Sequence, residues 1–128
     1  MPYLNLIVDK NISIDGIISR AEHFAKSITD DEIKTTEITT IISELAYNII
    51  KYSSEGVITL SVDLPNSLLI IAEDNGPGFV NDFEAAMQDG YSSSGSLGLG
   101  IPSLIRMCDD LDITTSSSGT KLTCVKEL

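Results

Sequence analysis

The sequence predicts an α+β fold, a two-layer α/β sandwich in which a mixed, mostly antiparallel sheet carries its helices on one face. Three observations support this prediction. The 128 residues, 42% of them apolar, are enough for one packed core, so we expect a single domain over residues 1–128. Short segments alternate apolar and polar side chains as half-buried strands do, whereas others repeat with helical spacing. Their order is strand, helix, helix, strand, strand, long loop, helix, strand, strand.

The N-terminal part of the chain is expected to contain one strand and two helices. Residues 3–8 alternate and therefore indicate a strand with one apolar face. Helical spacing of apolar residues then continues to about Ile28, and it resumes through the segment ISELAYNIIKY. The side chains that can cap these helices are Ser13 or Asp15 for the first and Thr29 or Asp30 for the second.

The C-terminal part is expected to contain two hairpins and a short helix. The predicted strands lie at 57–64, 68–73, 111–116 and 120–127. Turns at Pro65-Asn66-Ser67 and at Ser118-Gly119 join them in pairs. Helical character is weak at 82–88 and returns at 99–109. The intervening stretch 79–97 is poor in core residues, and loops of that length usually have a function.

The charge balance excludes several classes of protein. Eight Lys and Arg stand against 19 Asp and Glu, which gives a net charge of −11 and a pI near 4.2. A protein that neutralises nucleic-acid phosphates with basic side chains has the opposite balance, so we expect no nucleic-acid partner. No apolar run approaches the ~18 residues of a membrane span, and the start of the chain does not resemble a signal peptide. A cytoplasmic protein without a membrane partner is expected.

The cysteines and the single histidine point to no metal site. Cys108 and Cys124 could pair, but small secreted domains usually contain more cysteines, so buried free thiols are expected. With His23 as the only histidine, a metal site of the Cys/His kind is almost excluded. His23 is expected to be a solvated side chain on the first helix.

The middle of the chain has no basic residue. Between Lys51 and Arg106 there is no Lys or Arg, although this interval contains seven of the nine glycines. Such a segment can bind phosphate only through backbone N–H groups, a helix N-terminus and a divalent cation. A P-loop is absent, because no Gly-Lys-Ser/Thr sequence occurs.

The second helix has a polar flank beside its apolar stripe. At 100° per residue, Glu37, Glu44, Asn48 and Lys51 fall within roughly 60° of each other. A carboxylate, a carboxamide and an ammonium group in this arrangement could serve a magnesium–phosphate site. A solvated helix face with ordinary ion pairs is the alternative.

A turn rich in glycine follows the strand at 68–73. In Asp74-Asn75-Gly76-Pro77-Gly78, two glycines around a proline force a sharp turn and leave the backbone unobstructed. Asp74 ends the strand, where its carboxylate can accept a hydrogen bond from an exocyclic amine. An ordinary hairpin turn is the alternative, but no alternating strand follows.

A second glycine segment leads into the next helix. Gly95-Ser96-Leu97-Gly98-Leu99-Gly100 runs into Ile101-Pro102, with proline at an early helical position. This arrangement can receive phosphates at a helix N-terminus. Because Tyr91-Ser92-Ser93-Ser94 precedes it, a flexible linker is the alternative.

Together, these motifs resemble the N, G1, G2 and G3 boxes of the GHKL (Bergerat-fold) ATP-binding superfamily. The matching motifs are Glu44-x-x-x-Asn48, Asp74-x-Gly76-x-Gly78, Gly95-x-x-Gly98-x-Gly100 and Gly119-Thr120. The segments around them are similar to bacterial switch-protein serine kinases of the RsbT type, which act in stressosomes and are single small domains.

The resemblance implies ATP as the nucleotide and Mg²⁺ as its cation. It implies that Asp74 accepts a hydrogen bond from the adenine amino group, Asn48 ligates Mg²⁺ and Glu44 activates the attacking hydroxyl as general base. It also implies that Lys51 contacts phosphate and that Thr120 lies beside the adenine pocket.

The resemblance assigns the glycine segments to the nucleotide backbone and phosphates. Gly76 and Gly78 are expected to let the chain approach the nucleotide. The phosphate loop, beneath a lid at roughly 79–97, would comprise Gly95, Ser96, Leu97, Gly98, Leu99 and Gly100. Two departures, a lid without basic residues and a box that begins Gly-Ser rather than Gly-Gly, bear on lid ordering and turnover.

The expected function is an ATP- and Mg²⁺-dependent protein-serine/threonine kinase. By the resemblance, its substrate is a STAS-domain antagonist or scaffold protein in a partner-switching stress module, and a phosphatase or another output enzyme can be its second target. The alternatives are an anti-sigma factor kinase that sequesters a sigma factor and a nucleotide-gated binding module without catalysis.

Overall fold

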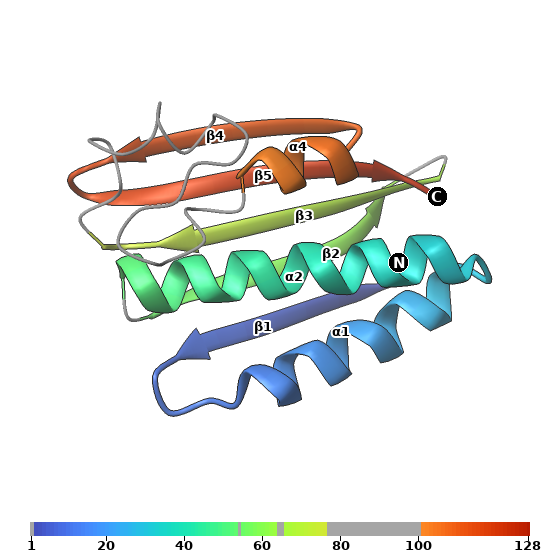
Figure 1. Cartoon of the computed structure of the whole chain (residues 1–128), viewed down its shortest axis with the longest axis horizontal. Coiled ribbons are helices and arrows are strands. Elements are labelled where there is room, and N and C mark those ends of the chain that lie inside the picture. Colours follow the sequence, from blue (N-terminus) through green and yellow to red (C-terminus); the bar gives the residue numbers. More distant parts are fainter. Residues whose placement is uncertain (1, 54, 64–65, 77–100) are drawn as a thin grey trace.

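One five-stranded sheet with its helices on one face forms the structure (Figure 1). The computed structural model describes residues 2–53, 55–63, 66–76 and 101–128. The elements are β1 (Tyr3–Asp9), α1 (Ile14–Ile28), α2 (Glu32–Tyr52), β2 (Glu55–Asp63), β3 (Ser67–Asp74), α4 (Ile101–Met107), β4 (Asp110–Ser116) and β5 (Gly119–Glu127). The predicted α+β architecture is confirmed, whereas the helical character expected at 82–88 lies outside the described residues.

The strand order in the sheet is β1-β2-β3-β5-β4. Each of the four described pairings is antiparallel, so this sheet contains none of the parallel pairs that a mixed sheet would have. β1 and β4 are therefore the edge strands, and β3 lies at the centre. The two predicted hairpins are present as β2–β3 and β4–β5.

The core fills the space between the sheet and the helices. Alternate strand residues such as Leu6, Ile58 and Ile70 are fully buried because they face the helical layer. From the other side, α2 contributes an apolar stripe of the predicted kind, with Ile38, Ile41, Ile42, Leu45, Ala46 and Ile49 all buried.

The helix caps agree with the sequence prediction for α1 but not for α2. Ser13 caps α1, and its side chain accepts the N–H of Gly16. For α2, Thr29 and Asp30 were expected, and this prediction is wrong. Asp31 has the extended backbone that a cap needs, and its Oδ1 accepts the N–H groups of Ile33 at 2.9 Å and Lys34 at 3.2 Å.

The two cysteines form a disulfide, so the expectation of free thiols is wrong. Cys108 directly follows α4, and Cys124 lies on the inner face of β5. The end of α4 packs over β5 and brings the two Cα atoms to 6.0 Å, a separation that a disulfide can span. Both residues are buried, as expected.

Lys126 also holds the C-terminal end of α4. It is only 4% exposed and lies on the inner face of β5, next after Leu122 and Cys124. Its Nζ donates to the carbonyl oxygen of Met107 at 2.7 Å and pairs with Oε1 of Glu37 at 3.1 Å. This single ammonium group therefore links α2, α4 and β5.

Replacing this lysine should destabilise the fold. Lys126→Met keeps the volume but leaves the Met107 carbonyl and the Glu37 carboxylate without their shared partner, and we expect a loss of about 1–3 kcal/mol in the free energy of unfolding. Urea unfolding followed by circular dichroism measures it. Lys121→Met, at an exposed position on the same strand, is the control and should change stability by less than about 0.5 kcal/mol. Equal free energies of unfolding for the two variants would contradict a stabilising role for the Lys126 contacts.

Candidate functional site

Three chain segments meet at one end of the molecule: the C-terminal end of α2, the end of β3 and the start of β5 (Figure 1). The loop after β3 approaches the end of α2 closely at Gly76, two residues beyond the strand. A Cβ atom at Gly76 would lie 2.6 Å from the carbonyl oxygen of Tyr52 and 2.7 Å from the Cα of Ser53. Only glycine fits there without a shift of the backbone, which explains this glycine on packing grounds.

Asp74 is the last residue of β3 and has a half-buried carboxylate. Its Oδ1 accepts the backbone N–H of Gly76 at 2.9 Å. Burial raises the pKa of Asp74 above its usual value, and backbone hydrogen bonds from Gly76 and Thr120 oppose part of that shift. The group is therefore a partly desolvated acceptor, for which a hydrogen-bond donor of a ligand is a favourable partner.

The start of β5 lies beside Asp74. Thr120 is the register partner of Asp74, is 4% exposed and shares a 2.8 Å hydrogen bond with the hydroxyl of Thr115. Gly119 before it has φ of +152°, and a side chain there would meet the carbonyl oxygen of Asp74. The close packing of β5 on β3 thus fixes the backbone on both sides of Asp74.

The polar flank of α2 approaches the same place. A Cβ at Gly56 would lie 3.0 Å from Cγ2 of Ile49 and 3.1 Å from Cβ of Asp74, so the turn of α2 that contains Asn48 lies next to the end of β3. Asn48 is buried, with 7% exposure.

Glu44 and Lys51 flank Asn48 along α2. Glu44 precedes Asn48 by one turn and is half-buried, and this burial raises the pKa of Glu44. Lys51 is exposed, with its Nζ 5.2 Å from the ring centroid of Tyr52. Glu37, which the periodicity placed on the same flank, pairs with Lys126 of β5.

The remaining predicted residues lie outside the described residues. They are the second glycine of the turn, the phosphate-loop segment and the lid, namely Gly78, Gly95, Ser96, Leu97, Gly98, Leu99, Gly100 and 79–97. α4 begins directly after them, at Ile101, two residues later than expected.

The donor set suits a cation that is shared with a ligand rather than held by the protein alone. Within the described residues, no group of three or more His, Cys, Asp or Glu side chains could enclose a metal ion. The carboxamide oxygen of Asn48 is a hard donor of the kind that Mg²⁺ accepts, and Mg²⁺ commonly takes most of its ligands from phosphates and water. The residues present therefore fit a magnesium–nucleotide complex.

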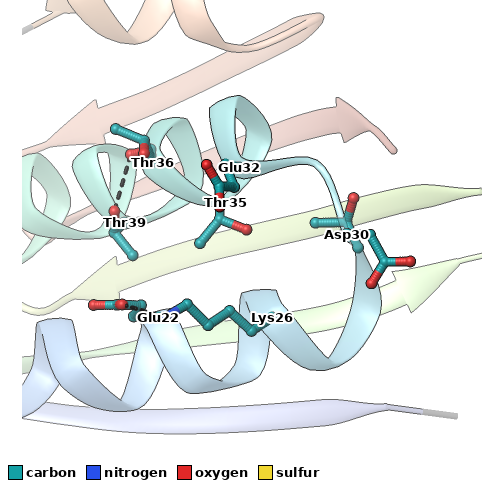
Figure 2. Close-up of a pocket in the computed structure, with 8 residues that line it drawn as sticks. Glu22, Lys26, Asp30, Glu32, Thr35, Thr36 and Thr39 are labelled. Atoms are coloured by element: carbon teal, nitrogen blue, oxygen red, sulfur yellow. Dashed lines mark hydrogen bonds and ion pairs between the residues drawn. The ribbon is translucent and has the colours of Figure 1, made fainter.

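Two cavities lie away from this site. One, of about 510 Å³, is at the junction of α1 and α2 and contains the Glu22–Lys26 ion pair of 2.8 Å (Figure 2). Its lining residue Thr35 is thirteen residues before Asn48 on α2, a distance of about 20 Å. The other cavity, of about 530 Å³, lies between α1 and β1. Neither was predicted, because each is lined by residues from different elements or turns.

One structural residue, Lys126, also escaped the sequence analysis. The period-2 pattern of β5 does place Lys126 on the buried face with Thr120 and Cys124, so that signal was present.

Among the helices of the described ranges, none combines the length and apolar character needed to cross a bilayer.

Comparison with known proteins places this geometry in a family. The profile of the histidine kinase-, DNA gyrase B- and HSP90-like ATPases matches residues 33–128. The chain is 38% identical over 108 residues to the serine/threonine-protein kinase RsbT of Bacillus subtilis, which covers 81% of this chain and 80% of that protein.

Solved structures agree on the fold. The RsbU and RsbW domains of a Mycobacterium tuberculosis protein match with a TM-score of 0.71 and 16% identity, over all of this chain and 32% of that longer one. The SiaB–SiaC complex of Pseudomonas aeruginosa matches with a TM-score of 0.69 and 10% identity, over 95% of this chain and 88% of that chain. The chain therefore belongs to the family of histidine kinase-, DNA gyrase B- and HSP90-like ATPases.

Proposed function

We propose that the chain is a protein-serine/threonine kinase that transfers the γ-phosphoryl group of ATP to a hydroxyl of a STAS-domain partner. The observation that carries the proposal is the position of Glu44, a half-buried carboxylate one helical turn before Asn48, on the helix whose C-terminal end lies beside Asp74. Family membership supports the use of ATP, and the 38% identity to a serine/threonine kinase supports the reaction.

Adenine recognition is assigned to Asp74. One carboxylate oxygen already accepts the N–H of Gly76, which orients the group, and its partial burial favours pairing with a ligand donor. The exocyclic amine of adenine is such a donor. Guanine presents a carbonyl oxygen at the same position and would leave the carboxylate facing another acceptor.

Base selectivity tests this assignment. We expect ATP to bind at least 30-fold more tightly than GTP, because an unpaired charge costs roughly 2–4 kcal/mol. Asp74→Asn should weaken ATP binding strongly, since the amide of the new side chain can present an N–H to the adenine amine, which is also a donor. Isothermal titration calorimetry measures both, and Glu73→Gln, at the exposed neighbouring position, is the control. Equal affinities for ATP and GTP would contradict the assignment.

The charge of the triphosphate needs a cation. The chain offers no Lys or Arg between Lys51 and Arg106, so the protein's own bases contribute little there. Mg²⁺ bound with the nucleotide would neutralise that charge and polarise the γ-phosphate, with Asn48 as its protein ligand.

Removal of the metal tests this step. ATP affinity should collapse in EDTA, and Asn48→Ala should lower the Mg²⁺-dependent affinity on the order of tenfold, or about 1.4 kcal/mol. Calorimetric titrations with and without Mg²⁺ measure the effect, and circular dichroism checks that the variant is folded. Tyr47→Ala, at an exposed neighbouring position, is the control. Tight ATP binding without metal would show that the charge argument is wrong.

Glu44 is proposed as the general base. Its carboxylate takes the proton of the partner's hydroxyl, the hydroxyl oxygen forms a bond to the γ-phosphorus, and the bond from that phosphorus to the bridging oxygen of ADP breaks. Because burial raises the pKa of Glu44, its ionised form is a stronger base than an exposed carboxylate. The products are ADP and a phosphorylated partner.

Phosphotransfer is the experiment that tests the function. Incubation with labelled ATP and the STAS proteins encoded nearby should label serine or threonine on the partner. Glu44→Gln should leave ATP affinity within about threefold and lower the transfer rate by roughly 100-fold. The wild-type rate should fall on acidification at a higher pH than an ordinary glutamate would give, because the raised pKa keeps Glu44 protonated there.

The control for this experiment is Glu55→Gln, at an exposed position just beyond α2. A wild-type transfer rate in Glu44→Gln would show that Glu44 is not the general base. ATP binding without any transfer would favour the nucleotide-gated binding module instead.

Charge repulsion gives a reason for the kinase to release its partner after the phosphoryl transfer. The phosphate adds negative charge to the partner, and this chain has a net charge of −11, so the modified partner should dissociate. The released kinase could then engage a phosphatase or another output enzyme.

A further inference from the structure

The edge strand β1 lacks the usual protection against pairing. Its seven residues contain no Pro, Lys or Arg, and only β2 lies beside it in the sheet. Tyr3 is 63% exposed and Ile7 57% exposed on the open face of the sheet. Natural edge strands are usually blocked by basic residues, proline or a bulge, so β1 can accept another strand.

A groove of about 530 Å³ lies between β1 and α1. Figure 1 shows α1 beside this edge strand. The lining of the groove is Leu4 from β1 and Ser19, Arg20, His23, Phe24 and Ser27 from α1. The residues from α1 share one face of the helix, and two of the six lining residues, Leu4 and Phe24, are apolar.

The groove is basic on an acidic protein. None of its lining residues is acidic, although the chain has 19 Asp and Glu against eight Lys and Arg. Glu22 lies on another face of α1, where it pairs with Lys26 in the cavity of Figure 2. Arg20 forms no ion pair with any residue of the described ranges, so its charge is available to a ligand.

We propose that β1 and this groove bind an extended segment of a partner protein in which acidic and apolar residues alternate. Side chains of an added strand point alternately to the two faces of the sheet. Those on the helical side would meet Arg20 and His23, which favours carboxylates. Those on the open side would lie beside Tyr3 and Ile7, which favours apolar residues.

A second copy of this chain fits the surface less well. Pairing of two β1 strands would bring Arg20 and His23 of one copy toward the same groove of the other, which offers no acidic residue to pair with them. The groove also shares no residue with the site at the end of α2 and β3, so the proposal stands or falls independently of the kinase function.

A peptide of defined pattern tests the proposal. A fluorescein-labelled ten-residue peptide of alternating Glu and Val should bind the full chain saturably, as measured by fluorescence anisotropy at low salt. Hydrogen exchange should show new protection of the amides of residues 3–9. Alternating Lys and Val should not bind, and neither should a block of five Glu followed by five Val.

Charge reversal provides the matched variants. Arg20→Glu should weaken binding of the Glu/Val peptide on the order of tenfold. The same variant should bind the Lys/Val peptide. Lys121→Glu changes the net charge equally, but it lies at an exposed position of β5, away from the groove, and should have little effect.

Four outcomes would overturn the proposal. They are failure of the Glu/Val peptide to bind, equal binding of the Lys/Val or block peptide, the same affinity in Arg20→Glu, and binding without protection of residues 3–9. A dimer in sedimentation velocity that excludes the peptide from β1 would assign this edge to a second copy instead.

Discussion

The approach of β3 to the C-terminal end of α2 is the constraint on which the candidate site depends. At Gly76 the two backbones are so close that even a methyl group would collide with Tyr52 and Ser53. Because α2 also packs its long apolar stripe on the sheet, the core sets the position of α2 along its own helix axis. The turn of α2 that contains Asn48 therefore lies next to the end of β3 as a consequence of hydrophobic packing.

Most of the fold was predictable because it follows periodicity. The alternation in β1, β2 and β5 and the helical spacing in α2 are repeated signals that no single residue can obscure. Helix ends depend instead on the backbone of one residue. Thr29, Asp30 and Asp31 are all capping types, and only the extended conformation of Asp31 selects it.

The site was predictable in part. The sequence motifs named Asp74, Gly76 and Thr120, and the antiparallel register brings these residues together. Their roles toward the nucleotide stay predictions, as do those of Glu44, Asn48 and Lys51. Angular spacing on a helix could not separate Glu37 from this group, because the partner of Glu37 is Lys126, 89 positions later in the sequence. The Cys108–Cys124 disulfide was missed for the same reason, since composition carries no information on which segments meet.

The C-terminal end of α4 is held by redundant attachments of different chemistry. The disulfide is covalent and depends on oxidation, whereas the ammonium group of Lys126 on the Met107 carbonyl does not. Backbone pairing adds a third attachment, with the N–H of Asp109 donating to Val125 at 2.9 Å. Reduction of the disulfide would therefore leave α4 docked on the sheet by two contacts that do not depend on the redox state.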